Sequence, residues 1–142
     1  MRLISLQRGA GTEQLASAGF PVLDLGPDLD RNGAFTDTAA IMANLDLVIT
    51  SDTSIAHLAG ALGVPTWLAL PFSPDWRWLL EREYCPWYPS MRLFRQKKRG
   101  DWADVFERMA AEVGRASLPV PAEEGRPGKA VLRGIPQECR VP

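Results

Sequence analysis

The clearest pattern of apolar and polar positions in this chain is a strand–helix–strand pattern between residues 45 and 71. Residues 47–50 form a short β-branched apolar run, which is typical of a strand buried on both faces. The polar residues 51–54 follow, and their side chains can cap the free N–H groups at the start of a helix. A stripe at helical spacing then predicts a helix that packs on a sheet; its members are Ile55, Leu58, Ala59 and Leu62. After a Gly-Val-Pro break, residues 66–70 predict a second buried strand, which completes a βαβ unit.

Further strands and helices alternate on both sides of this unit. Apolar runs predict strands at 2–7, 22–25 and 92–96, and helical spacing predicts helices at 13–18, 36–45, 75–80 and 101–113. The last helix has the most regular apolar stripe, made of Trp102, Val105, Phe106, Met109, Ala110 and Val113. Alternating elements of this kind predict a three-layer α/β/α fold with a mostly parallel, Rossmann-like sheet of five strands.

Polar residues mark the loops and helix starts between these elements. Residues 26–35 are rich in Gly, Pro, Asp and Asn, which predicts a loop with solvated Asp28 and Asp30. Caps are predicted at Thr36 or Asp37, at Asp75 and at Asp101. Ala56, Gly60 and Gly63 form a small-residue face on which the central helix can approach its neighbour closely.

Composition places residues 1–116 in one globular domain and 117–142 in a tail. The 142 residues are 46% hydrophobic and 23% charged, as in ordinary globular proteins. Proline recurs through residues 117–142 without an apolar face, which predicts a disordered tail.

Charge and cysteine content limit the partners and the compartment. The net charge of −1 predicts no nucleic-acid or membrane partner, and the basic run 97–99 is interpreted as a solvated turn. The uncharged residues 53–74 are interpreted as βαβ core rather than a membrane span. Two cysteines without metal spacing, and no apolar signal segment after Met1, predict a cytoplasmic protein without a metal cofactor.

The candidate chemistry lies where the strand 47–50 meets the following helix. A helix start presents free N–H groups and a positive dipole end, which favour an anion, and Thr53 and Ser54 add hydroxyl donors. His57, the only histidine, follows one turn later. Asp52 fits a cap or a ribose contact, because a carboxylate repels phosphate. The simpler alternative is a capped turn with a half-buried histidine.

Two other segments carry weaker signals. Arg8 follows the first strand and could reach a diphosphate, although a solvent-exposed arginine is the more frequent outcome. Aromatic residues crowd the segment after residue 70; they are Trp76, Trp78, Tyr84, Trp87 and Tyr88. Their faces could stack on a base or a sugar, but most of them are expected to plug the end of the core. Arg77 could pair with a phosphate or with a neighbouring acid, and the salt bridge to the acid is favoured.

Residues 52–65 resemble the donor-site signature of heptosyltransferase-like GT-B glycosyltransferases. The similarity extends to the C-terminal glycosyltransferase-like region of bacterial tetratricopeptide-repeat proteins through residues 5–9, 71–80, 86–89 and 92–96. It covers about residues 2 to 113. Ser54 departs from the family pattern, which has glycine there. The family ordinarily has one more strand before Arg2. Without it, the strand order is either 2-1-3-4-5, or a gap stays open for another chain.

The resemblance implies that the chain is the nucleotide-diphosphate-sugar-binding half of a GT-B fold. The candidate diphosphate-binding residues are then Thr53, Ser54, His57 and Arg8. A protonated His57 would neutralise the charge of the leaving diphosphate. No residue is assigned as catalytic, because the acceptor-side half that usually supplies the base is outside this chain. The isolated chain is therefore expected to bind without turnover. The alternative is an interaction module that keeps only the fold, and the expected partners are a missing N-terminal half or a second copy.

Overall fold

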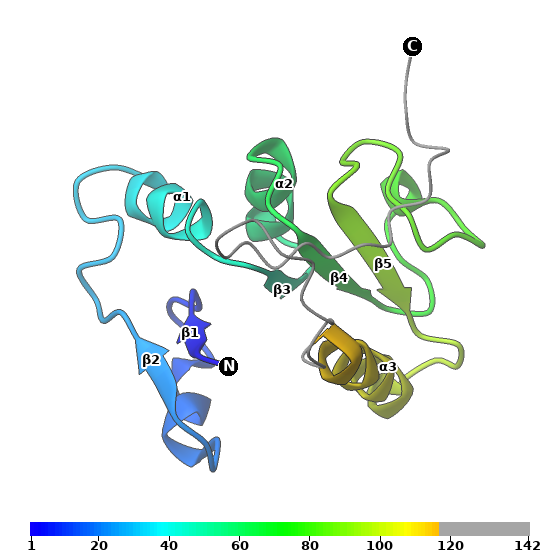
Figure 1. The fold of residues 1–142 in the computed structure, drawn as a ribbon, viewed down its shortest axis with the longest axis horizontal. Helices are drawn as coiled ribbons and strands as arrows, with labels where there is room; N and C mark the ends of the chain where they lie inside the picture. Colours follow the sequence, from blue (N-terminus) through cyan, green and yellow to red (C-terminus); the bar gives the residue numbers. More distant parts are fainter. Residues whose placement is uncertain (117–142) are drawn as a thin grey trace, which may run out of the picture. The chain divides into compact units, whose positions relative to one another are not determined.

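The computed structural model describes residues 1–116, which divide into two compact units (Figure 1). The first unit comprises residues 1–44, and the second begins at residue 45. The proline-rich tail predicted for residues 117–142 lies outside the described residues. No helix within residues 1–116 combines the length and apolar character needed to cross a membrane.

The first unit is a two-stranded parallel sheet followed by a helix. Its elements are β1 (Leu3–Ser5), the 3-10 helix η1 (Thr12–Ser17), β2 (Val22–Asp24) and α1 (Thr36–Met42). Leu3 of β1 pairs with Val22 of β2. The α-helix predicted at 13–18 is wrong in type, because η1 buries none of its residues and starts without a side-chain cap. A helix of one or two turns is stable as an α-helix only when one face packs against the protein, and η1 has no such buried face.

Asp30 anchors the loop of this unit to α1, so the prediction of a solvated Asp30 is wrong. Its two carboxylate oxygens accept hydrogen bonds from the Thr38 N–H at 2.9 Å and the Thr38 hydroxyl at 2.6 Å. In return, Asp37 accepts the Asp30 N–H at 2.8 Å. The Asp30 side chain is only 4% exposed, and its bonds with Thr38 hold the pKa of its carboxyl below the usual range. Asp28 is solvated as predicted, with 78% of its side chain exposed.

The cap predicted for α1 at Thr36 or Asp37 is also wrong. Phe35, in a left-handed conformation with φ 62°, holds the N-cap position and contributes no side-chain bond. Instead, the carboxylate of Asp30, eight residues before Thr38, accepts the Thr38 N–H, which is one of the free backbone donors in the first turn of α1.

The second unit is a three-stranded parallel sheet with one helix on each face (Figure 1). Its elements are β3 (Val48–Ser51), α2 (Ser54–Ala61), β4 (Thr66–Leu70), the 3-10 helix η2 (Trp76–Trp78), β5 (Met91–Arg95) and α3 (Trp102–Ala116). Each strand pairs with the next one in the chain, with Val48 opposite Thr66 and Thr66 opposite Met91. The predicted α/β fold with parallel strands is therefore confirmed.

The predicted five-stranded sheet is not formed by the ladders of residues 1–116. They join β1 to β2, and β3 to β4 to β5, so neighbours within each sheet are as predicted, but β1 and β3 are not paired. β1 and β2 have three residues each, and such short strands offer few ladder hydrogen bonds.

Two clusters of buried side chains cover the two faces of the second sheet. On one face, Ala56 of α2 packs with Leu68, Leu70, Leu93 and the fully buried Trp78. On the other, Val105 and Met109 of α3 pack with Trp67, Ala69 and Phe94. Asp101 caps α3 as predicted, because its carboxylate accepts the Asp104 N–H at 3.2 Å. The basic run at 97–99 is an exposed turn, also as predicted.

The buried stripe of α2 differs from the predicted one. Ala56, Ala59 and Gly60 are buried, whereas Leu62 is 45% exposed. The small residues bring the helix close to its neighbours, as the pattern of Ala56 and Gly60 predicts, and the larger residues are displaced to the flanks. A Cβ atom at Gly60 would lie 2.4 Å from the ring of Tyr88, which shows how close that approach is.

Candidate functional site at the start of α2

The N-terminus of α2 has two backbone donors without a partner. Thr53 is the N-cap residue in an extended conformation (φ −141°, ψ 174°), and no side chain caps the helix. The Ala56 N–H returns to the Thr53 carbonyl at 3.0 Å, whereas the N–H groups of Ser54 and Ile55 bond to nothing among residues 1–116. Free N–H groups at the positive end of a helix dipole favour an anion.

Two hydroxyl groups stand beside these donors. The Thr53 hydroxyl lies 3.4 Å from the Thr50 hydroxyl and 3.4 Å from the Ser51 carbonyl, both weak contacts. Thr53 and Ser54 are exposed. Both hydroxyls can therefore turn toward a ligand at little cost.

Asp52 does not provide the predicted helix cap. The extended backbone at Thr53 starts the helix one residue later, so the carboxylate of Asp52 is out of position to accept its first N–H groups. Its charge instead contributes to raising the pKa of Arg77, behind the larger contributions of the hydrogen bond and charge of Asp75.

His57 is half-buried between two aromatic rings of the β4–β5 connection. Its Nδ1 lies 3.1 Å from the hydroxyl of Tyr88, and its ring stacks on Trp78 with centroids 5.4 Å apart and planes at 24°. Trp78 is fully buried, and the ring of Tyr88 packs over Gly60. These contacts fix the orientation of the imidazole.

Asp75 and Arg77 form a rigid pair at the same edge of the sheet. Arg77 donates from Nε to Asp75 at 2.9 Å and from Nη2 at 3.1 Å, and Asp75 also caps η2 by accepting the Arg77 N–H at 3.0 Å. The salt bridge favoured for Arg77 and the cap predicted at Asp75 are both confirmed. The bonds to the backbone N–H and the guanidinium of Arg77 lower the pKa of Asp75.

The sequence predicted Asp75 as a helix cap, favoured a salt bridge over a phosphate contact for Arg77, and favoured the core over a ligand for the ring of Tyr88. Tyr88 is 31 residues from His57, so no local spacing links them. A usable signal was the topology: the segment after β4 leaves from the carboxyl end of a strand parallel to β3, which places it at the edge where α2 begins.

Arg8 belongs to the first unit and has a carboxylate neighbour there. Its Nη1 lies 3.9 Å from Asp30, and 49% of its side chain is exposed. At the limit of an ion pair, this contact leaves the guanidinium largely solvated, which agrees with the more frequent outcome for such an arginine.

The aromatic segment is less buried than predicted. Trp78 and Tyr88 pack in or against the core, but Trp76 is 77% exposed, Trp87 58% and Tyr84 44%. The prediction that most of these rings plug the core is therefore wrong. The connection is long and its 3-10 turn places successive rings on opposite sides, so only one side can face the sheet.

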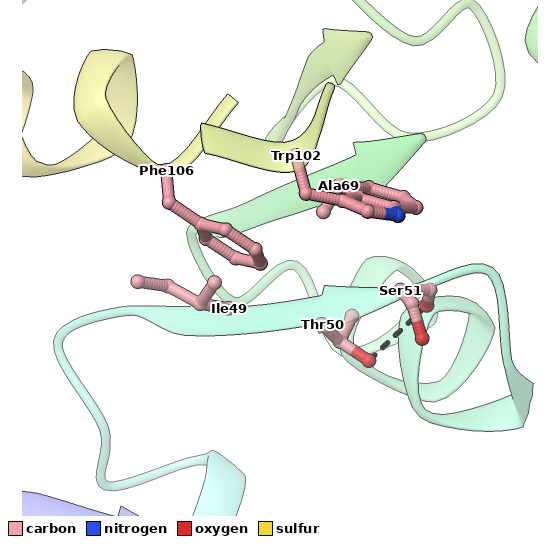
Figure 2. Close-up of a pocket in the computed structure, with 6 residues that line it drawn as sticks. All are labelled: Ile49, Thr50, Ser51, Ala69, Trp102 and Phe106. Carbon is pink, nitrogen blue, oxygen red and sulfur yellow. Dashed lines mark hydrogen bonds between the residues drawn. The ribbon is translucent and has the colours of Figure 1, made fainter. Parts of the chain in front are cut away.

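A groove of about 510 Å³ lies on the other face of the sheet, between β3 and α3. Figure 2 shows the rings of Trp102 and Phe106 on one side and Ile49, Thr50 and Ser51 across from them. Ile49 is 50% exposed and Phe106 54% exposed. Among residues 1–116, no charged side chain lines the groove, so its described walls suit an apolar partner better than a phosphate.

Comparison with known proteins gives one informative match. No family model matches the sequence, and no solved structure matches it. Protein FlbA of Caulobacter vibrioides is 36% identical over 116 residues. The match takes in 75% of this chain but only 18% of FlbA, so the chain spans less than a fifth of that relative.

Among residues 1–116, no three His, Cys, Asp or Glu side chains are grouped closely enough to hold a metal ion. The groups at the start of α2 are hydrogen-bond donors and one imidazole. They suit an anion rather than a cation.

Proposed function

We propose that this chain is the nucleotide-diphosphate-sugar-binding domain of a glycosyltransferase-like protein. The observation that carries the proposal is the uncapped start of α2, where the N–H groups of Ser54 and Ile55 are free and two exposed hydroxyls adjoin them. The carboxyl end of a parallel sheet is where α/β folds bind nucleotides. The resemblance of residues 52–65 to a GT-B donor site names the ligand class.

In this proposal, each residue of the site has a separate task. The diphosphate accepts hydrogen bonds from the backbone of Ser54 and Ile55 and from the hydroxyls of Thr53 and Ser54. His57, held by Tyr88 and Trp78, supports the phosphate or the ribose. Asp52, no longer needed as a cap, is available for a ribose hydroxyl.

The isolated chain binds its donor without transferring the sugar. None of the residues at the start of α2 is placed as a general base for an acceptor, and an open half-site leaves the donor in contact with water. Affinity in a half-site is weak, on the order of tens of micromolar to millimolar.

The test is a titration followed by amide NMR signals. UDP, ADP and GDP are added separately, and at least one should shift the signals of Thr53, Ser54 and Ile55. Unmoved signals with all three nucleotides at several millimolar would rule out the proposed site.

Ser54→Pro is the informative variant, because Ser54 is the first helical residue and Thr53 before it is already extended, as a residue before proline must be. The change removes one N–H and one hydroxyl while preserving the helix start, and it should abolish the response. Ser54→Ala is the matched control, since it removes only the hydroxyl and should weaken binding without abolishing it.

A non-catalytic interaction module is the second candidate, and the groove between β3 and α3 favours it. Exposed apolar groups gathered on one face mark protein contacts more often than isolated ones do. If this function is the principal one, Phe106→Asp should disrupt association with the rest of the protein while leaving any nucleotide response intact.

A further inference from the structure

The connection between β4 and β5 carries two indole rings that the fold leaves open to solvent. Trp76 is 77% exposed and Trp87 is 58% exposed, whereas Trp78 between them in sequence is fully buried. Tryptophan is usually buried over most of its surface, because its large apolar area contributes strongly to the core. Two exposed indole rings on one short segment therefore indicate a surface that binds a ligand or a partner.

Both rings are mounted on a backbone that is fixed from several sides. The Trp87 indole N–H donates to the Arg77 carbonyl at 2.8 Å, which ties the second ring to the turn that carries the first. Asp75 clamps Arg77 through its guanidinium and its backbone N–H. Arg95 at the end of β5 donates to the Trp78 carbonyl at 3.3 Å, so the strand holds the end of the same turn. The Trp87 ring and the backbone that carries Trp76 therefore lose little freedom when a ligand binds.

The same segment adjoins the start of α2. Buried Trp78 stacks on His57, and Tyr88 reaches His57 with its hydroxyl. A ligand whose diphosphate lies at Ser54 and Ile55 would extend its neighbouring group over this connection.

We propose that Trp76 and Trp87 form a stacking surface for the sugar ring of the donor. This rests on the proposed function. A pyranose has one face of C–H groups, which packs on an indole plane, and a rim of hydroxyls, which need polar partners. Polar groups are carried by the residues next to both rings in the chain: Asp75 and Arg77 flank Trp76 and form an ion pair, and Tyr88 follows Trp87. Aromatic rings combined with a few placed polar groups are the usual composition of a small-molecule site.

The test compares each nucleotide with its sugar conjugate: UDP with UDP-glucose, ADP with ADP-glucose, and GDP with GDP-mannose. The chain has five tryptophans, whose indole N–H signals are resolved by NMR in a region free of backbone amides. For the nucleotide that binds, the conjugate should shift the indole signals of Trp76 and Trp87, and the free nucleotide should leave them in place. Both ligands should shift Ser54 and Ile55.

Three other outcomes overturn the inference in distinguishable ways. If Ser54 and Ile55 respond but both indoles stay unmoved with every conjugate, the sugar does not stack there, although the site at α2 stands. If the free nucleotide shifts the indoles as much as its conjugate does, they bind the base instead. If no amide or indole responds, the proposed function fails and the inference fails with it.

Variants measure the contribution of each ring. Trp76→Ala and Trp87→Ala should each reduce the gain in affinity of the conjugate over the free nucleotide by a factor of about two to ten, the size of one aromatic contact. Phe106→Ala is the control, since Phe106 is 54% exposed and lies in the groove between β3 and α3. It should leave that gain unchanged. An equal loss in the control would show that the effect is not local to the two indoles.

Discussion

The two faces of the β3–β4–β5 sheet are covered by helices of opposite character. α2 is eight residues long and buries Ala56, Ala59 and Gly60, whereas α3 is fifteen residues long and packs Val105 and Met109 into the other cluster. Small side chains let α2 lie close to the aromatic rings of the β4–β5 connection, and the candidate site forms there. The large side chains of α3 contribute more buried apolar surface. We infer that the α2 face is built for close approach and the α3 face for stability.

The largest effect should come from the α3 face. Met109 is 3% exposed in the cluster with Trp67 and Phe94, so Met109→Ala should lower the free energy of unfolding by about 2–5 kcal/mol. Chemical denaturation followed by circular dichroism measures the change. Ala110→Ser, at an exposed position on the same helix, is the control and should change little. Equal effects of the two would mean that α3 is not docked as described.

Paired glycine substitutions test the close approach of α2. Gly60→Ala places a methyl group 2.4 Å from Tyr88 and should destabilise the protein by about 1–3 kcal/mol. Gly114→Ala in α3 meets nothing within 4 Å and should stabilise it by about 0.5–1 kcal/mol, because glycine is a poor helix residue. Thermal unfolding of both variants shows whether each substitution raises or lowers the stability of the protein. A neutral Gly60→Ala would contradict the packing of Tyr88 on α2.

The contact between His57 and Tyr88 should have a smaller effect on stability than on the site. Tyr88→Phe keeps the ring over Gly60 but removes the hydroxyl 3.1 Å from His57, at a cost of about 0.5–1.5 kcal/mol. Nucleotide-induced shifts at Ser54 and Ile55 should weaken in the same variant, because the imidazole loses one of its two supports. If the shifts at Ser54 and Ile55 are unchanged, the orientation of His57 does not contribute to ligand binding.

The smallest effect should appear in the pH dependence of the Asp75–Arg77 pair. The pKa of Asp75 is lowered by the Arg77 N–H first and the Arg77 guanidinium next. A carboxyl with a lower pKa in the folded state stabilises the fold above its unfolded pKa, and that stabilisation is lost as pH falls through the folded value.

Asp75→Asn should therefore melt below the wild type at pH 7, and the difference should shrink below about pH 4, near the unfolded pKa. Melting curves of both proteins from pH 7 to pH 3 measure it. Asp28→Asn, at a side chain that is 78% exposed, is the control and should show no such convergence. A gap that stays constant down to pH 3 would contradict the role of the Asp75 charge.

Elements defined by local pattern were predictable from the sequence. The β-branched run at 47–50, the uniformly apolar run at 66–70 and the stripe containing Val105 and Met109 each formed the predicted element. The run at 66–70 is buried throughout, but the burial predicted for both faces of β3 is wrong, because Ile49 is 50% exposed. The caps at Asp75 and Asp101 were predictable for the same reason, since each bonds to an N–H two or three residues later.

Features that depend on distant contacts were not predictable in this way. Asp30 was expected to be solvated because its bonds to Thr38 cross eight residues of loop, and nothing in the composition of 26–35 indicates them. The buried face of α2 was predicted from its large apolar residues. In the structure Tyr88 lies so close to the helix that only small residues fit on the buried face. The exposure of Trp76 and Trp87 follows from the course of the β4–β5 connection, which residue types alone do not specify.

The order of pairing in the second sheet bears on how the chain folds. β3 pairs with β4, and β4 with β5, so every strand finds its partner in the next segment to be made. Pairing with the next strand keeps the separation of partners along the chain smaller than pairing with a more distant strand would, and a smaller separation favours faster folding. During synthesis, β4 would meet a completed β3 as it emerges, and β5 would then meet β4. We therefore expect this unit to grow strand by strand in the direction of translation, with α3 closing the last exposed face.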